Sequence, residues 1–204
     1  MLVLTAAIVC AADVSAHRTD EYLQAARLAI DPGRVQIELD LTPGIALAEA
    51  ILADIDRNRD DVVSDGERRA YASLVMSALT LDVDGTRLPM RLDASDFPGA
   101  EAVRRGEGTI RLHAVAVLPR MSAGSHQLLF RNRHQRDRSV YLANALVPES
   151  PDVAITAQRR DANQSELIID YVVRGSPATS TAGLLFGSIA AATVLSLLVR
   201  SVRL

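Results

Sequence analysis

The sequence predicts a mainly β domain, built as a two-sheet β-sandwich, with one helix-loop-helix segment inserted between two of its strands. Three observations predict this class. Alternating apolar and polar residues, typical of half-buried strands, recur in short segments between residues 22 and 173. Turn-forming residues such as Asp84-Gly85 separate those segments. Between residues 43 and 79 the alternation stops, and apolar residues instead recur every three or four positions, as in helices.

The first two strands are expected at residues 22–30 and 34–41, on either side of the turn Asp31-Pro32-Gly33. One face of the second strand is apolar and carries Val35, Ile37, Leu39 and Leu41. Further strands are expected at 79–84, 86–92, 109–118, 125–131, 140–146, 153–158 and 166–173, with a polar loop at 93–108. About nine short strands at this spacing are typical of a two-sheet sandwich.

The inserted segment is expected to start with a helix at Thr42-Pro43, where Thr is the N-cap and Pro the first helical residue. Apolar residues every four positions then mark the incoming helix: Leu47, Ile51 and Ile55. The outgoing helix has an apolar stripe that comprises Ala70, Tyr71, Leu74, Val75, Ala78 and Leu79.

Between these two helices lies the segment 56–67, DRNRDDVVSDGE, in which oxygen-bearing side chains recur at alternate positions. It resembles the twelve-residue calcium loop of the EF-hand family, a resemblance that covers about 35 residues with its flanking helices. The resemblance implies six ligands for Ca²⁺, at loop positions 1, 3, 5, 7, 9 and 12: Asp56, Asn58, Asp60, Val62, Ser64 and Glu67. Val62 would contribute its backbone carbonyl, and Glu67 both carboxylate oxygens.

Two other positions test the fit of this loop to the family. Position 8 is Val63, an apolar residue that such a loop turns inward. Position 6 is Asp61, where the family has Gly because the turn needs a positive φ; Asp adopts that conformation at modest cost. No second loop of this kind is found to pair with it, so we expect weak binding, with a Kd of roughly 10⁻⁴–10⁻³ M and a structural role for calcium. The alternative is an acidic surface turn that matches the motif by chance.

The chain ends predict export and anchoring. Residues 1–16 form an apolar run followed by small residues, as in a secretory signal peptide, and contain the only cysteine, Cys10. Cleavage there would leave His17 as a first residue able to offer its amine and ring to copper or nickel; the favoured alternative is an ordinary terminal residue that binds no metal, since no second His lies nearby in the sequence.

Residues 174–181 are a polar linker, and 182–199 an uncharged stretch long enough for a transmembrane helix, followed by a basic cytoplasmic tail at 200–204. This arrangement predicts a single-pass membrane protein whose domain, residues 17–173, lies outside the cytoplasm. The alternatives are a buried helix of the domain and a sorting tail removed after export.

The net charge, the basic segment and the histidines give little evidence for a nucleic-acid-binding protein, an enzyme or a second metal site. A net charge of −3 gives no signal for nucleic acid, and we find no catalytic motif, so an enzyme is not expected. The basic segment 131–138 is interpreted as a solvated turn, although it has the charge to meet an anionic partner. The histidines His113, His126 and His134 are interpreted as isolated surface or strand residues, since their spacing matches no metal site.

Two function classes remain. The first is a membrane-anchored, non-enzymatic calcium-binding module that interacts with another envelope protein outside the cytoplasm. The second follows from the order of signal, mature His17, two strands and acidic loop, which is similar to that of uncharacterised periplasmic components of nickel/cobalt-type metal exporters. That resemblance implies an accessory subunit of a metal-ion transporter.

Overall fold

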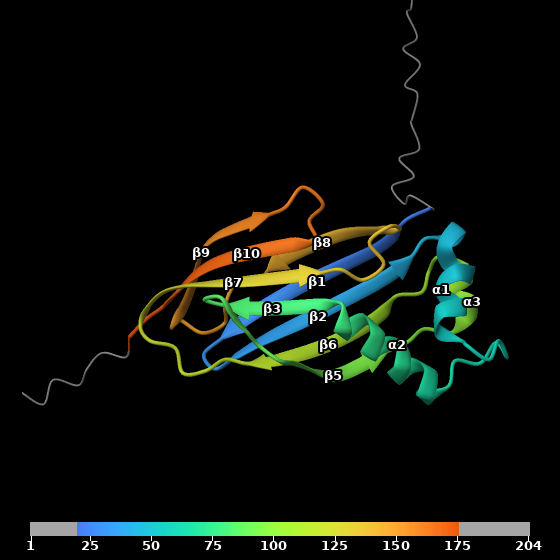
Figure 1. Ribbon diagram of the computed structural model, residues 1–204, viewed down its shortest axis with the longest axis horizontal. Helices are drawn as coiled ribbons and strands as arrows, with labels where there is room; N and C mark the ends of the chain where they lie inside the picture. Colours follow the sequence, from blue (N-terminus) through green and yellow to red (C-terminus); the bar gives the residue numbers. More distant parts are fainter. Residues whose placement is uncertain (1–19, 176–204) are drawn as a thin grey trace, which may run out of the picture. The chain divides into compact units, whose positions relative to one another are not determined.

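The computed structural model describes residues 20–175, of which those up to Arg174 belong to one compact unit. This unit is mainly β, as expected (Figure 1). Its strands are β1 (Tyr22–Asp31), β2 (Arg34–Pro43), β3 (Leu79–Val83), β4 (Thr86–Arg87), β5 (Met90–Asp96), β6 (Ile110–Val117), β7 (Gly124–Asn132), β8 (Ser139–Ala145), β9 (Val153–Arg160) and β10 (Glu166–Val173). Its helices are the 3₁₀ turn η1 (Ile45–Leu47) and the α-helices α1 (Ala48–Ile55), α2 (Asp65–Ser77) and α3 (Ala100–Arg104).

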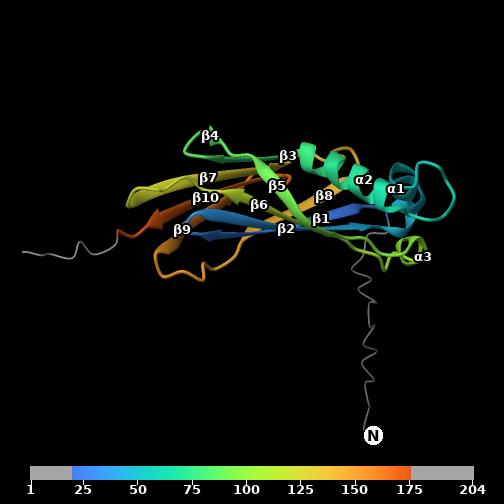
Figure 2. The same cartoon turned by 90° about the horizontal axis from the view of Figure 1, so that it is seen from below.

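The strands form two five-stranded sheets, in the orders β5-β6-β2-β1-β8 and β4-β3-β7-β10-β9. Neighbouring strands are antiparallel except for β1 and β8, which are parallel. The sheets lie in two layers, seen edge-on in Figure 2. The three α-helices gather at one end of the layers, whereas the β1–β2 turn, the β6–β7 loop and the end of β10 lie at the opposite end (Figure 1).

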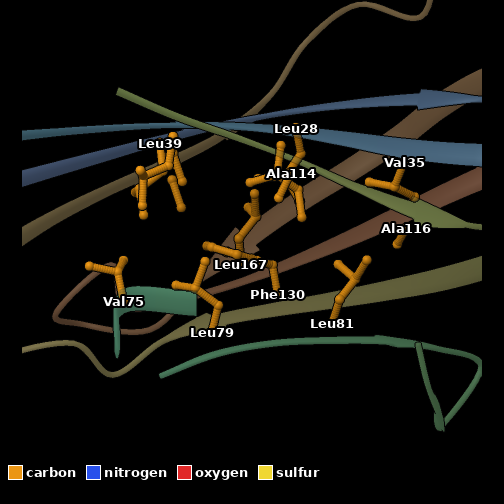
Figure 3. Close-up of a cluster of buried hydrophobic side chains, with 14 of the residues drawn as sticks. Leu28, Val35, Leu39, Val75, Leu79, Leu81, Ala114, Ala116, Phe130 and Leu167 are labelled. Carbon is orange, nitrogen blue, oxygen red and sulfur yellow. The ribbon is translucent and has the colours of Figure 1, made fainter. Parts of the chain in front are cut away.

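Side chains that alternate along the strands fill the space between the layers. The apolar face predicted for residues 34–41 is confirmed, because Val35, Ile37, Leu39 and Leu41 are all at most 1% exposed. Figure 3 shows side chains of β1, β2 and β6 meeting those of β3, β7 and β10 in one cluster, with Val75 of α2 at its edge. Each fully buried leucine or isoleucine contributes about 1.5–3 kcal/mol, so this face-to-face burial holds the layers together.

The helix start expected at Thr42-Pro43 is wrong. Strand β2 continues to Pro43, which pairs with Tyr22 of β1, and Thr42 hydrogen-bonds Thr109 through its side chain at 2.9 Å. Gly44 precedes the turn η1, and α1 begins only at Ala48. Pairing with β1 along its whole length outweighs the local helix signal, and a proline is tolerated at the end of a strand.

Two expectations after residue 79 are also corrected. The strand expected at 86–92 is divided at Leu88-Pro89, so β4 lies in one sheet and β5 in the other. The segment 93–108, expected to be a polar loop, contains the end of β5 and the helix α3. The turn Asp84-Gly85 is as expected, with φ of 49° and 79° at its two residues.

The expectations for the chain ends concern residues that are not described. The signal peptide 1–16, His17, the span 182–199 and the tail 200–204 all lie outside residues 20–175, as does most of the linker. Among the described residues, no helix is long and apolar enough to cross a membrane.

Candidate functional site

The segment 56–64 joins α1 to α2 at the helical end of the molecule (Figure 1). The apolar residues expected on α1 are confirmed for Ile51 and Ile55, which are at most 2% exposed. On α2, Tyr71 and Val75 are buried as expected, but Leu74 is 45% exposed and Ala70 is exposed too. Ala72 is buried instead, so the face that α2 turns to the sheets is rotated towards Ala72 relative to the predicted stripe.

Asp56, the residue at position 1, follows α1 directly and is only 8% exposed. Its Oδ1 accepts hydrogen bonds from the backbone N–H groups of Arg59 (2.8 Å) and Asp60 (3.3 Å), and its Oδ2 from that of Asp61 (2.9 Å). Three N–H groups directed at one carboxylate wrap the loop around it.

The side chains at positions 3 and 5 lie together. Asn58 donates through Nδ2 to Oδ2 of Asp60 at 2.9 Å, and its Oδ1 accepts from the N–H of Asp60 at 3.1 Å. Asp60 in turn accepts through Oδ1 from the N–H of Val62 at 2.9 Å. The side chains at positions 3 and 5 therefore lie within hydrogen-bonding distance of each other.

Glu67, at position 12, reaches back to the start of the loop. Its Oε1 accepts from the N–H of Arg57 at 3.0 Å, while its Oε2 accepts from the hydroxyl of Ser64 at 2.7 Å. Ser64 is also the N-cap of α2 and forms a capping box with Glu67. The hydrogen bond from Ser64 is the main reason that the pKa of Glu67 lies below its usual value.

Position 6 has the conformation anticipated for it. Asp61 has a φ of 63°, in the left-handed region that Asp tolerates better than most residues. Its carboxylate accepts from Arg104 of α3 at 2.5 Å, and the same guanidinium donates to Glu49 of α1 at 2.9 Å. At position 8, Val63 is partly buried against the core, as expected.

The contribution of α3 to this site is not among the features that the sequence predicts. Val103 packs against Ala48 and Leu52 of α1 in a small apolar cluster of its own, which places Arg104 beside the loop. A signal was present, since AEAVR after Pro98-Gly99 consists mainly of good helix formers. Its contact with α1 depends on the return of the chain from β5, which no local pattern specifies.

Of the six predicted ligands, the structure links the side chains of Asn58 and Asp60, and separately those of Ser64 and Glu67. Glu67 also binds the backbone N–H of Arg57, beside Asp56, which brings position 12 to position 1. Val62, at position 7, has an exposed side chain. Within residues 20–175, no three His, Cys, Asp or Glu side chains converge as a ready metal site. The carboxylates bind the N–H groups of the loop instead, and the oxygen donor set fits a hard cation such as Ca²⁺.

A buried polar junction fixes α2 to the sheets. The hydroxyl of Tyr71 lies 2.8 Å from that of Tyr22 on β1 and 3.2 Å from Nε2 of His134 in the β7–β8 turn. All three residues are at most 4% exposed. His134 is therefore not a surface residue, contrary to the interpretation of the basic segment as a solvated turn.

Side-chain amide contacts with the start of β1 hold the β7–β8 turn against the sheet. Asn132 donates to Gln24 at 2.8 Å, and the Gln24 amide donates to the backbone carbonyl of His134 at 3.0 Å. The next residue, Gln135, donates to Asp54 of α1 at 2.8 Å. The β7–β8 turn thus contacts both helices that flank the loop. Of the other two histidines, His126 bonds Asp84 at 2.8 Å, and the side chain of His113 lies on exposed β6 surface.

No protein-family model, curated protein or solved structure matches this chain.

We expect Tyr71→Phe to lower the free energy of unfolding by about 1–3 kcal/mol, because it leaves the buried Tyr22 hydroxyl and His134 Nε2 without their shared partner. Urea denaturation measures this. The matched control is Tyr171→Phe, since the buried Tyr171 hydroxyl has no hydrogen-bond partner among the described residues. Equal losses in the two variants would contradict the role given to Tyr71.

Burial lowers the pKa of His134 to about 4, whereas the unfolded chain takes up this proton near 6.5. The unfolded state therefore binds more protons between these values, so stability should decrease as the pH falls from 6.5 to 4, by about 3 kcal/mol from this group alone. Above pH 6.5 the contribution is fully present. Unfolding free energies measured across this range should show a shallower pH dependence in His134→Gln, and an unchanged slope would refute the assignment.

Proposed function

We propose that this protein is an exported, non-enzymatic calcium-binding module, anchored by residues 182–199, in which one Ca²⁺ binds to the loop 56–67. The single observation that supports it best is the closure of the loop: the Glu67 carboxylate reaches the N–H of Arg57, next to Asp56. Positions 1 and 12 are thus neighbours in space although eleven residues apart in the chain. Such closure is what a twelve-residue loop needs to surround one ion.

The ligands in this proposal are the side chains of Asp56, Asn58, Asp60, Ser64 and Glu67 and the carbonyl of Val62. When bound, calcium supplies a positive charge that offsets the carboxylates of the loop. The chain's own part is to hold these oxygens at one end of a stable β domain. The junction at Tyr71 and the bridge from Arg104 support the loop from two sides.

Calcium acts here as a clip that keeps α1 and α2 in place. The loop has no pairing loop in the sequence and carries Asp61 in a left-handed conformation, both of which favour weak binding. Calcium outside the cytoplasm is often near the millimolar range, so such a site is filled much of the time. The accessory-subunit alternative depends on His17, which lies outside the described residues.

Calorimetric titration with calcium should show one ion bound with a Kd of roughly 10⁻⁴–10⁻³ M, and saturation should raise Tm by about 4 °C. Glu67→Gln should weaken binding at least about tenfold, because it removes a charged ligand while almost preserving shape. Asp65→Asn is the matched control: it removes the same charge two residues away, at a side chain that is 81% exposed. If both variants bind like the wild type, the loop is not a calcium site.

Asp61→Gly should bind calcium several-fold more tightly, since glycine adopts the φ of 63° without steric cost. It also removes the ion pair with Arg104, so Arg104→Gln serves as the control for that loss. The same titration compares all three proteins. Weaker binding by Asp61→Gly than by Arg104→Gln would mean that the aspartate itself supports the ion.

A further inference from the structure

A second candidate site lies at the opposite end of the molecule from the loop. A cavity of about 380 Å³ opens there between the β1–β2 turn, the β6–β7 loop, the start of β9 and the end of β10. Figure 1 places these segments at the end away from the helices. This volume is within the range of small-molecule sites in proteins.

The wall of the cavity is mostly apolar. It is formed by core residues that close the end of the sandwich, Ile30, Leu118 and Val153, together with Met121 and Val173 at the rim. Pro32 and Pro119 lie in the two turns beside it and restrict their backbones. A site of this kind accommodates a short hydrocarbon or aryl group and excludes a strongly hydrated one.

One buried polar group in this wall lacks a partner. Tyr171 of β10 is 1% exposed, and its hydroxyl oxygen makes no hydrogen bond to any described residue. Burial raises the pKa of Tyr171 to about 12, so the phenol is neutral and keeps its proton to donate. A buried hydroxyl without a bond is unfavourable, by about 1–3 kcal/mol, so an acceptor on a ligand would relieve a cost that the free protein bears.

The cavity is also lined by one positively charged side chain that forms no ion pair with the described residues. Arg120, in the β6–β7 loop, is exposed and has no ion-pair partner among the residues that the structure describes. Asp31, the acidic residue on the same lining, is instead held by Arg34 at 3.3 Å and by Gln36 at 3.0 Å. The uncompensated charge at the cavity is therefore positive.

Contacts of His126 hold the β6–β7 loop, which carries Arg120, in place. His126 contacts the ring of Tyr171 with a centroid distance of 5.6 Å. Its two ring nitrogens lie 2.9 Å from the carbonyl oxygen of Ser122 and 2.8 Å from Asp84. The loop is thus tied to the strand next to β10, so the cavity is formed before a ligand arrives, which favours binding.

We propose that this cavity binds a small amphipathic carboxylate, whose hydrocarbon part occupies the apolar wall. Its oxygen atoms accept a hydrogen bond from the hydroxyl of Tyr171 and pair with the guanidinium of Arg120. The apolar wall binds the hydrocarbon chain, the Tyr171 hydroxyl binds an acceptor oxygen, and the Arg120 guanidinium binds the negative charge. Together these three features select for an anion with a short chain. The site is separate from the loop 56–67 and does not depend on calcium.

The test uses octanoate and octanol as probes, with the full chain held in phosphatidylcholine nanodiscs and empty nanodiscs as the blank. Calorimetry should show saturable 1:1 binding of octanoate in the micromolar-to-millimolar range, tighter than that of octanol. Tyr171→Phe should weaken binding of both probes about fivefold, because both contain an acceptor oxygen. Arg120→Gln should weaken octanoate about fivefold and leave octanol unchanged.

Two controls separate the site from general effects. Arg133→Gln removes one exposed positive charge at the helical end and should leave both affinities unchanged. The melting temperature of ligand-free Tyr171→Phe should not fall, since the hydroxyl lost has no partner to leave behind. Absence of saturable octanoate binding at millimolar concentration would overturn the proposal. So would full binding by both Tyr171→Phe and Arg120→Gln, or a weakening by Arg133→Gln equal to that by Arg120→Gln.

Discussion

The hydroxyl group of Tyr71 is the contact on which the arrangement of the site depends. It connects a helix of the inserted segment to the first strand of one sheet, through Tyr22, and to the turn between two later strands, through His134. Such a network in a buried environment is favourable only when every member is satisfied. The helix-loop-helix is therefore held at a fixed position on the β domain and is not a flexible appendage.

Hydrogen bonds to the acidic side chains also explain the conformation of the loop 56–67. A segment with five carboxylates in twelve residues would repel itself if those groups were only crowded together. Here the carboxylates of Asp56, Asp60 and Glu67 accept hydrogen bonds from backbone N–H groups, and Asp61 pairs with Arg104. The loop is thus shaped by its own negative charge, and the carboxylates of Asp56, Asp60 and Glu67 belong to the donor set proposed for calcium.

The two ends of the molecule differ in polarity: one carries the acidic loop and the other a mostly apolar cavity. At the helical end, the loop is organised around acidic side chains that accept hydrogen bonds from its own backbone N–H groups. At the other end, the apolar interior opens between the sheets beside a hydroxyl and a guanidinium that have no side-chain partner within residues 20–175. The sheets between them form a continuous packed core, so each end is built on the same support and presents a distinct surface.

Much of the architecture could be predicted because it follows from local periodicity. The alternation of Val35 to Leu41 determined a strand with one buried face, and Asp84-Gly85 determined a turn, since both signals act within a few residues. The positive φ of Asp61 and the inward position of Val63 followed in the same way from the loop motif. These features depend on backbone sterics and burial of one face, which a short sequence window contains.

What the sequence could not determine depends on residues far apart in the chain. Strand β2 extends through Thr42-Pro43 only because Tyr22 pairs with it, and His134 is buried only because Tyr71 and Gln24 meet it. Arg104 reaches Asp61 because α3 packs on α1, a contact between segments about fifty residues apart. The sequence by itself thus determined the mainly β class and the acidic loop with its ligand-like spacing. Only the tertiary structure decided which partners satisfy the buried polar groups, because partner choice depends on the whole chain packing at once.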